Sequence, residues 1–243
     1  FASLYDQERT PPLQARLPAL HSRELVQVLE KFASQPQKLG DLEDEYFSTQ
    51  HWNETMSQQD GTIRRENKFP ENSEELIFSG PHFFVGNPFY KTPREECTKN
   101  ADYDILDLTE LPYDYLPRTN YVPACSKEEY ERRTPKVPWD GQSVIEYYRI
   151  TSRTMIGASA ERTLISSIIP LKIAHIDLGF SIIFKDIKNV PICCALFNSI
   201  CFDFLVKTTG KGHFRNDVAS MLPMFYPNSM QHLTLRNLSL NCL

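Results

Sequence analysis

Apolar residues recur every three or four positions near the start of the chain and form short, separate runs in the remainder. The first pattern lies between residues 13 and 34, where charged residues separate the apolar ones, and it predicts an amphipathic helix. Pro11 and Pro12 mark the approach to this helix and Pro36 ends it, because proline donates no backbone hydrogen bond. The acidic segment from Leu39 to Phe47 predicts a second, short helix.

The later apolar runs are short and rich in β-branched and aromatic residues, which favours strands. Such runs predict strands at residues 76–78, 83–85, 143–153, 163–170 and 179–184. Residues 190–206 are apolar at helical spacing and predict one buried helix, and residues 219–222 and 233–240 predict short elements. Strands and helices do not alternate regularly, which disfavours a doubly wound sheet. The expected fold class is α+β, a mixed sheet with flanking helices and an N-terminal helical segment.

Two segments are expected along the chain. Residues 1–75 are acidic and are predicted to form a mainly helical connector, whereas residues 76–243 are predicted to form the functional domain. Between residues 86 and 138 prolines and tyrosines are dense, which is typical of extended segments held against a core. The chain begins at Phe1 and ends at Leu243 in an apolar run, so we expect it to be a piece of a longer protein.

Composition narrows the class of protein. A content of 41% hydrophobic and 12% aromatic residues excludes a disordered or collagen-like chain. No uninterrupted apolar run reaches the roughly 18 residues that span a bilayer, and no secretory leader pattern is present, so we expect a cytoplasmic protein without membrane contact. The six cysteines lack metal-ligand spacing and are expected to be free, mostly buried thiols in a reducing cytoplasm.

The net charge of −5 conceals an uneven distribution. Residues 1–117 carry 11 Lys and Arg against 21 Asp and Glu, whereas residues 118–243 carry 15 against 10. This asymmetry indicates that a polyanion, if one is bound, contacts the second half of the chain. Chance segregation of surface charge explains the asymmetry equally well.

Two short motifs are similar to known functional loops without completing them. Asn87-Pro88-Phe89-Tyr90 is similar to the Asn-Pro-Pro-Tyr loop of adenine methyltransferases, but no Gly-rich cofactor turn precedes it, which favours a structural turn. Residues 208–212 lack the first glycine and the final Ser or Thr of a nucleotide phosphate-binding loop. We interpret them as part of a flexible basic loop whose expected contacts with DNA phosphates come from Lys207, Lys211, His213 and Arg215.

Residues 146–169 are the richest in candidate nucleic-acid contacts. Arg149, Arg153 and Arg162 lie among tyrosines and small hydroxyl residues such as Ser159, and arginine can bind guanine or phosphate through two hydrogen bonds. In a strand, Arg149 and Arg153 point to the same face and can therefore contact one groove. Arg162 follows Glu161, so we expect a carboxylate to hold it in a structural role. A buried Glu161–Arg162 network at a sheet edge is the alternative interpretation of this segment.

Several short stretches follow one another in order over most of residues 76–243: Ile77-Phe78-Ser79-Gly80-Pro81-His82-Phe83, Asn87-Pro88, Leu116-Pro117-Arg118-Thr119-Asn120-Tyr121, Tyr147-Tyr148-Arg149, Glu161-Arg162-Thr163-Leu164-Ile165, Ile169-Pro170, Asp203-Phe204 and residues 238–243. In this order they resemble the region downstream of the catalytic domain in large single-chain bacterial restriction-modification methylases of the adenine-specific type II kind. The resemblance implies a target-recognition region that reads DNA sequence. It also implies that an upstream domain binds S-adenosylmethionine and methylates adenine N6.

These observations predict the DNA sequence-recognition region of a bacterial restriction-modification adenine methyltransferase. We assign no catalytic or metal-binding residue and expect no cofactor in this chain, since S-adenosylmethionine belongs to the parent's missing domain. The expected partners are double-stranded DNA and the catalytic domain of the parent chain. The candidate DNA-binding residues are Arg118, Tyr121, Arg149, Arg153, Ser159, Arg162, Lys207, Lys211, His213 and Arg215. The alternatives are a divergent nuclease or methyltransferase domain, and a protein-interaction module that docks through residues 1–75.

Overall fold

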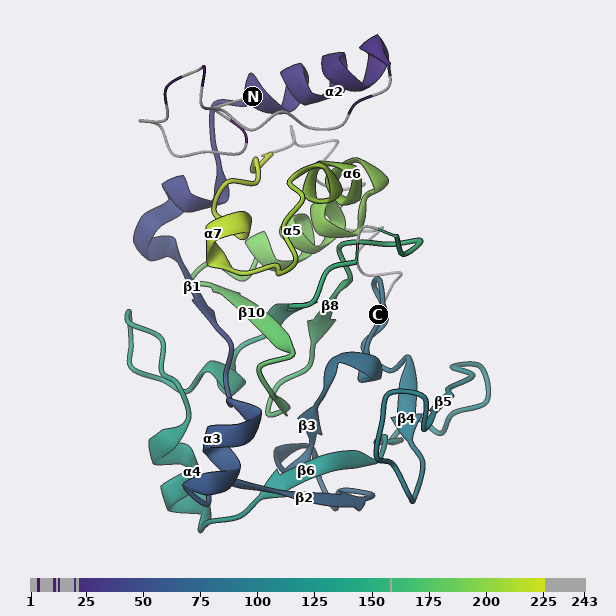
Figure 1. The fold of residues 1–243 in the computed structure, drawn as a ribbon. Coiled ribbons are helices and arrows are strands. Elements are labelled where there is room, and N and C mark those ends of the chain that lie inside the picture. The colour runs from purple at the N-terminus through teal and green to yellow at the C-terminus, as the bar shows by residue number, and fades with distance from the viewer. Residues whose placement is uncertain are drawn as a thin grey trace.

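The computed structural model describes residues 4, 11, 13, 20, 22–157 and 159–225 of the chain (Figure 1). Its centre is a four-stranded antiparallel sheet in the order β1-β10-β7-β8. The strands are β1 (Tyr46–Thr49), β10 (Gly179–Phe184), β7 (Arg149–Arg153) and β8 (Ser166–Ile169). Every residue of β10 and β8 is buried, which indicates that other elements cover both faces of the sheet.

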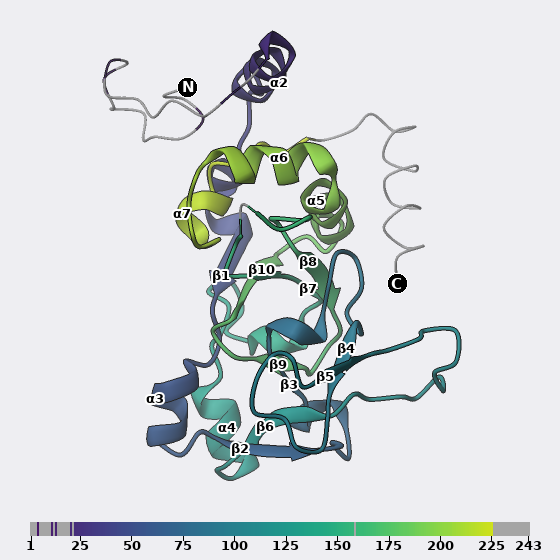
Figure 2. The ribbon, with the colours of Figure 1, turned by 45° about the vertical axis from the view of Figure 1, so that its right-hand side comes forward.

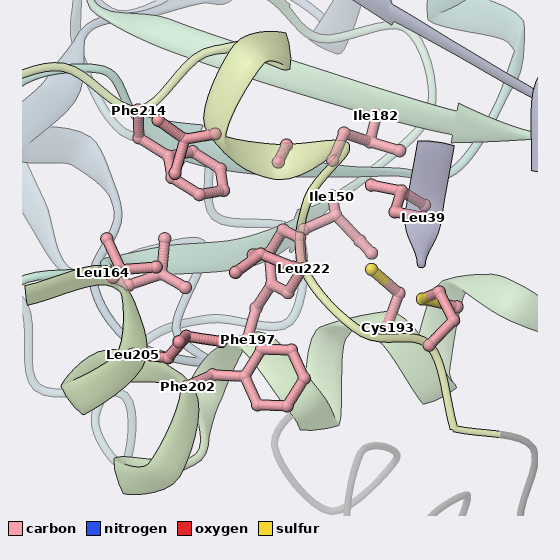
Figure 3. Close-up of a cluster of buried hydrophobic side chains, with 14 of the residues drawn as sticks. Leu39, Ile150, Leu164, Ile182, Cys193, Phe197, Phe202, Leu205, Phe214 and Leu222 are labelled. Carbon is pink, nitrogen blue, oxygen red and sulfur yellow. The ribbon is translucent and has the colours of Figure 1, made fainter. Parts of the chain in front are cut away.

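One face of the sheet carries a helical layer. It consists of α5 (Asn189–Asn198), α6 (Ile200–Thr208) and α7 (Asn216–Ala219), and α2 (Arg23–Ala33) lies beyond them (Figures 1 and 2). Phe197, Phe202 and Phe214 pack with Ile150 and Ile182 of the sheet in the largest core cluster (Figure 3). Helix α2 contributes Leu29 and Phe32 to the same cluster. Burial of these apolar side chains is the main force that holds the helices on the sheet.

The other face carries a second layer of short elements. Two strand pairs are antiparallel, β2 (Ile63–Lys68) with β6 (Thr119–Pro123) and β4 (Lys91–Pro93) with β5 (Tyr103–Ile105), and one is parallel, β3 (Ile77–Phe78) with β9 (Ala174–His175). The helices of this layer are α3 (Glu54–Gln59) and α4 (Lys127–Arg133). The 3₁₀ turns within the described residues include η2 (Leu39–Glu45), η3 (Ser73–Glu75), η4 (Gly80–His82) and η5 (Val144–Glu146). Figures 1 and 2 place α3, α4, β2 and β6 at the end of the molecule opposite α6.

The expected α+β class is confirmed, and the predicted strand at residues 179–184 coincides with β10. The single helix expected over residues 190–206 is wrong, because α5 and α6 meet at Ser199 with a bend of 68°. The hydroxyl of Ser199 donates to the carbonyl of Leu196 at 2.7 Å and accepts from the N–H of Phe202 at 3.2 Å. One side chain therefore ends the first helix and caps the second.

Other boundaries differ from the sequence predictions in both directions. Helix α2 coincides with the second half of the helix expected at residues 13–34. Most of the first half of that expected helix lies outside the described residues. The helix expected over residues 39–47 is a 3₁₀ turn followed by β1, and residues 83–85 form no strand. β7 and β8 are shorter than expected, and α7 ends at Ala219, where the predicted element begins. The element expected at residues 233–240 lies outside the described residues.

The division expected at residue 75 does not separate two folded units. β1 and β2 both precede this position, yet β1 pairs with β10 and β2 pairs with β6. The described part of residues 1–75 therefore supplies two strands to sheets that the remainder completes. The expectation of a separate connector is corrected accordingly, although helices and 3₁₀ turns do outnumber strands among the described residues of this part.

Within residues 22–157 and 159–225, no single helix is long and apolar enough to cross a membrane. Helices α5 and α6 taken together have the required length and composition, but they form a bent pair.

Three of the cysteines in this part of the chain are buried, namely Cys97, Cys193 and Cys194. Cys125 is half-buried and Cys201 is exposed.

Candidate nucleic-acid interface

Two segments far apart in sequence are paired at the edge of the helical layer. Met155, just after β7, forms an isolated antiparallel bridge with His213, which lies between α6 and α7. The N–H of Phe214 donates to the carbonyl of Thr154 at 2.7 Å, and the N–H of Ile156 donates to the carbonyl of Gly212 at 3.1 Å. We call residues 154–162 and 207–215 together the paired-loop surface.

The sequence accounts for the shape of the second of these segments. Gly210 has φ +64°, a left-handed conformation that suits glycine at the end of a helix. The hydroxyls of Thr208 and Thr209 donate to carbonyls of the last turn of α6, each at 2.7 Å. Phe214 is fully buried in the core cluster and fixes the far end of the segment. Residues 210–213 therefore leave the helix and return to the core within a few positions.

The charge of the paired-loop surface comes mainly from its second segment. Lys207, His213 and Arg215 are exposed, and residues 207–215 contain no Asp or Glu. The Nζ of Lys211 lies 3.2 Å from a carboxylate oxygen of Asp217, which is itself exposed and neutralises part of this charge. The arrangement leaves cationic side chains available to an anionic ligand such as a phosphate backbone.

Ser159 and Arg162 lie in the first segment and differ in exposure. Ser159 is exposed, whereas Arg162 is partly buried and donates from Nη2 to the carbonyl of Asn198 at 2.9 Å. Its Nε lies 3.3 Å from the carboxylate of Asp203 on α6. The same carboxylate oxygen accepts the N–H groups of Thr163 and Leu164, each at 2.8 Å. Arg162 thus has a carboxylate neighbour as expected, but the partner is Asp203 and not Glu161.

Arg149 and Arg153 share a face of β7 as predicted, but this face packs against the second layer. Arg149 is fully buried, and its Nη1 donates to the carbonyls of Val144 at 3.2 Å and Tyr147 at 3.3 Å. Burial lowers the pKa of Arg149 to about 10. The expectation that Arg149 contacts DNA is therefore corrected, because no part of its guanidinium reaches the surface.

Arg153 is also engaged within the protein. Its Nη2 donates to the carbonyl of Phe83 at 2.6 Å, and the guanidinium lies over the rings of Phe83 and Phe84 at 5.8 and 5.6 Å from their centroids. Burial lowers its pKa as well. Arg153 ties the end of β7 to the segment that follows η4, and this position favours a structural role.

Arg118 and Tyr121 lie in the second layer, apart from the paired-loop surface. Tyr121 is buried and its hydroxyl donates to the carboxylate of Glu54, so the expected DNA contact by Tyr121 is corrected. Burial raises the pKa of Tyr121, and the neighbouring carboxylate of Glu54 raises it further. Arg118 is half-buried, with its guanidinium 4.4 Å from the centroid of the Phe69 ring.

The segment around Asn87 forms a turn. The side-chain oxygen of Asn87 accepts the N–H of Phe89 at 2.8 Å, and the N–H of Phe84 donates to the backbone carbonyl of Asn87 at 2.8 Å. His82 nearby is fully buried, with its ring nitrogens close to Ser79 and to the carbonyl of Arg118. These groups are occupied by local contacts, which does not fit the presentation of Asn87 to a target base.

A cavity of about 640 Å³ lies in the second layer and is lined by both signs of charge. Lys127 is paired with Glu74 at 2.8 Å, Lys172 with Glu146 at 2.5 Å and Lys68 with Glu75 at 3.0 Å. Because its cations are largely paired, this cavity has less to offer a polyanion than the paired-loop surface. Among the described residues, no group of three or more His, Cys, Asp or Glu side chains is arranged to hold a metal ion.

Sequence reasoning did not identify Met155, which stands at the centre of the paired-loop surface. It was missed because an apolar residue at the end of a strand-like run is normally part of the core.

Comparison of the chain with models of known protein families, and with curated protein sequences, finds no match.

Proposed function

We propose that this chain is a DNA sequence-recognition region and that its parent is an adenine-specific restriction-modification methyltransferase of the bacterial cytoplasm. The ordered stretches described above support the class of protein through their resemblance to such enzymes. The distribution of charge supports double-stranded DNA as the ligand, since Lys207 and Arg215 are exposed on a segment without carboxylates. S-adenosylmethionine would be bound by the catalytic domain of the parent.

The pairing of the two loops is the observation that carries this proposal. The two segments are candidate DNA contacts for separate reasons. The first belongs to residues 146–169, which stand out for their arginines and hydroxyls, and residues 207–215 stand out for their cations. The bridge between Met155 and His213 brings them to one surface. Such a surface can combine phosphate contacts, which position a protein on the duplex, with polar contacts to bases, which specify sequence.

The candidate contacts that remain on the paired-loop surface have different expected roles. Lys207, Lys211 and Arg215 supply positive charge for phosphates. Ser159 and His213 are exposed side chains that can exchange hydrogen bonds with base edges. Arg162 supports the first loop from beneath through Asp203 and Asn198.

Selection from a random duplex library tests the proposal directly. The 243-residue chain is used to enrich binding duplexes, and the affinity of an enriched duplex is then measured at several salt concentrations. We expect enrichment of a defined sequence and an affinity that falls about 40-fold between about 50 and 200 mM salt, as three phosphate contacts require. Failure to enrich any duplex, or an affinity that does not change with salt, would overturn the proposal and favour a protein-interaction module.

A further inference from the structure

Met155 is an exposed apolar side chain between two buried neighbours. It is 67% exposed, whereas Thr154 and Ile156 are 2% and 8% exposed. Successive residues of an extended segment point to opposite sides, so burial of both neighbours directs the Met155 side chain away from the core. Exposure of a large thioether forgoes the favourable free energy of its burial, and Met155 shares this exposure with other apolar side chains such as Met56 and Ile200.

The backbone on both sides of Met155 is fixed. The N–H of Thr154 donates to the carbonyl of Leu178 at 3.0 Å, and its carbonyl accepts the N–H of Phe214 at 2.7 Å. The N–H of Ile156 donates to the carbonyl of Gly212 at 3.1 Å. Met155 therefore projects from a braced position and not from the tip of a free loop.

The surroundings of Met155 combine open space with positive charge. His213 lies directly opposite in the antiparallel bridge, and side chains of opposed residues lie on the same side of the pair. A Cβ added at Gly212 would meet no atom within 4 Å, so the flank of the bridge is open. Lys211 and Arg215 lie two positions on either side of His213. A polyanion drawn to these cations would meet Met155 and His213 first.

We propose, resting on the function proposed above, that Met155 is a wedge that inserts between stacked base pairs of bound duplex DNA. Proteins that insert apolar side chains, methionine among them, partly unstack a base step and kink the duplex. The flexible thioether suits such a step because it adapts to an irregular gap. His213 stands beside the wedge and contacts the edge or the phosphate of the opened step. Specificity then arises in part from how easily a given step opens.

The experiment uses the duplex enriched by the wild-type chain, labelled at its two ends for energy transfer. Wild-type protein should change the end-to-end transfer on binding. Met155→Ala should abolish this change and lower the affinity roughly tenfold, while Met155→Leu should retain most of both. The slope of affinity against salt should stay the same in both variants, because no cation is removed. Met56→Ala is the matched control, since Met56 is 66% exposed on α3 in the second layer, and it should behave as wild type.

The outcomes separate this inference from the function on which it rests. If Met155→Ala binds and alters energy transfer as wild type does, the wedge is wrong and DNA binding stands. If Met155→Ala loses affinity but the bound duplex is still distorted, Met155 acts by contact alone and the wedge is also wrong. If the wild-type chain binds no duplex, the proposed function and the wedge fail together, and the exposed methionine then favours a protein partner.

Discussion

The guanidinium group of Arg149 is buried, and its neighbours replace few of the hydrogen bonds that it would make with water. Its Nε and Nη2 have no hydrogen-bond partner in the described part of the chain, and its Nη1 bonds only to two backbone carbonyls. Removing a charged group from water costs several kcal/mol unless partners replace the lost hydration. Burial lowers the pKa values of the neighbouring His51 and His175, and the charge of Arg149 lowers them further. This cluster joins the central sheet to the second layer, so its role is structural.

Substitution of Arg149 should change stability and not DNA affinity. Arg149→Ala leaves a cavity and removes the side-chain donor from the carbonyls of Val144 and Tyr147, and we expect the free energy of unfolding in urea to fall by about 3 kcal/mol. Arg149→Met fills most of the space without a buried charge, so its free energy of unfolding should fall by less than half of that amount. Loss of duplex affinity in Arg149→Met, with the unfolding curve unchanged, would restore the DNA contact first expected for this residue.

Buried histidines should make the fold sensitive to acid. Burial lowers the pKa of His82 to about 4 and, together with the charge of Arg149, that of His175 to about 3. In the unfolded chain histidine has a pKa of about 6.5, so below this pH the unfolded state binds more protons than the folded state. The stability due to the neutral rings is complete above about pH 6.5 and is lost as pH falls toward the folded values.

The free energy of unfolding should therefore decrease by about 1.4 kcal/mol per pH unit for each such histidine between roughly pH 6 and 4.5. His175→Gln should reduce this slope by about one histidine's share, whatever its effect on the absolute stability. Equal slopes in His175→Gln and wild type would show that His175 is not neutral in the folded state.

At the scale of elements, the contact between α6 and the loop before β8 supports the paired-loop surface. Asp203 on α6 accepts the N–H groups of Thr163 and Leu164 and lies beside Arg162. One carboxylate thus accepts two backbone N–H groups of the loop and forms an ion pair with its arginine. This anchor fixes the end of the connection between β7 and β8, whereas the bridge to His213 fixes its start.

Removal of this anchor should loosen the first loop. We expect Asp203→Ala to lower the free energy of unfolding by roughly 2–4 kcal/mol, since two buried N–H groups lose their acceptor. Asp203→Asn keeps an oxygen acceptor, so its free energy of unfolding should fall clearly less than that of Asp203→Ala. Amide hydrogen exchange at Thr163 and Leu164 provides the second readout, and slow exchange at both in Asp203→Ala would contradict the assigned contact.

The local sequence pattern predicted an element correctly where the spacing of apolar residues matches their burial. The prediction was wrong where a single side chain or a distant segment of the chain determines the structure. β10 was predicted because its residues are uniformly apolar or small and bounded by a turn. The bend between α5 and α6 was missed because the hydroxyl of Ser199 overrides an otherwise continuous apolar run. The shared face of Arg149 and Arg153 followed from strand geometry, but which layer covers that face depends on tertiary packing.

At the scale of the whole molecule, the N-terminal segment is part of one cooperative structure. β1 forms an edge of the central sheet, and Leu29, Phe32 and Leu39 belong to the same core cluster as side chains of α5 and α6. These are long-range pairings, which local patterns do not specify, and this is why a boundary at residue 75 was expected. The same limit applies to the paired-loop surface, whose charges were visible in sequence but whose bridge was not.

A fragment of residues 76–243 should therefore not fold on its own. It loses β1 from the central sheet, β2 from its pair with β6, and buried core side chains such as Leu29, Phe32 and Leu39. We expect its thermal unfolding, followed by circular dichroism, to lack the cooperative transition of the full chain. A cooperative transition at a similar temperature would show that residues 1–75 are a separate unit after all.

The salt dependence of duplex binding tests the central claim most directly. Lys207 and Arg215 are exposed on the paired-loop surface, whereas Lys99 and Lys136 are exposed in the second layer. We compare Lys207→Gln/Arg215→Gln with Lys99→Gln/Lys136→Gln, which changes the net charge equally. The first pair should flatten the slope of log affinity against log salt by about two, one for each lost phosphate contact, and the second pair should leave it at the wild-type value. Equal slopes in the two double variants would contradict the assignment of DNA binding to the paired-loop surface.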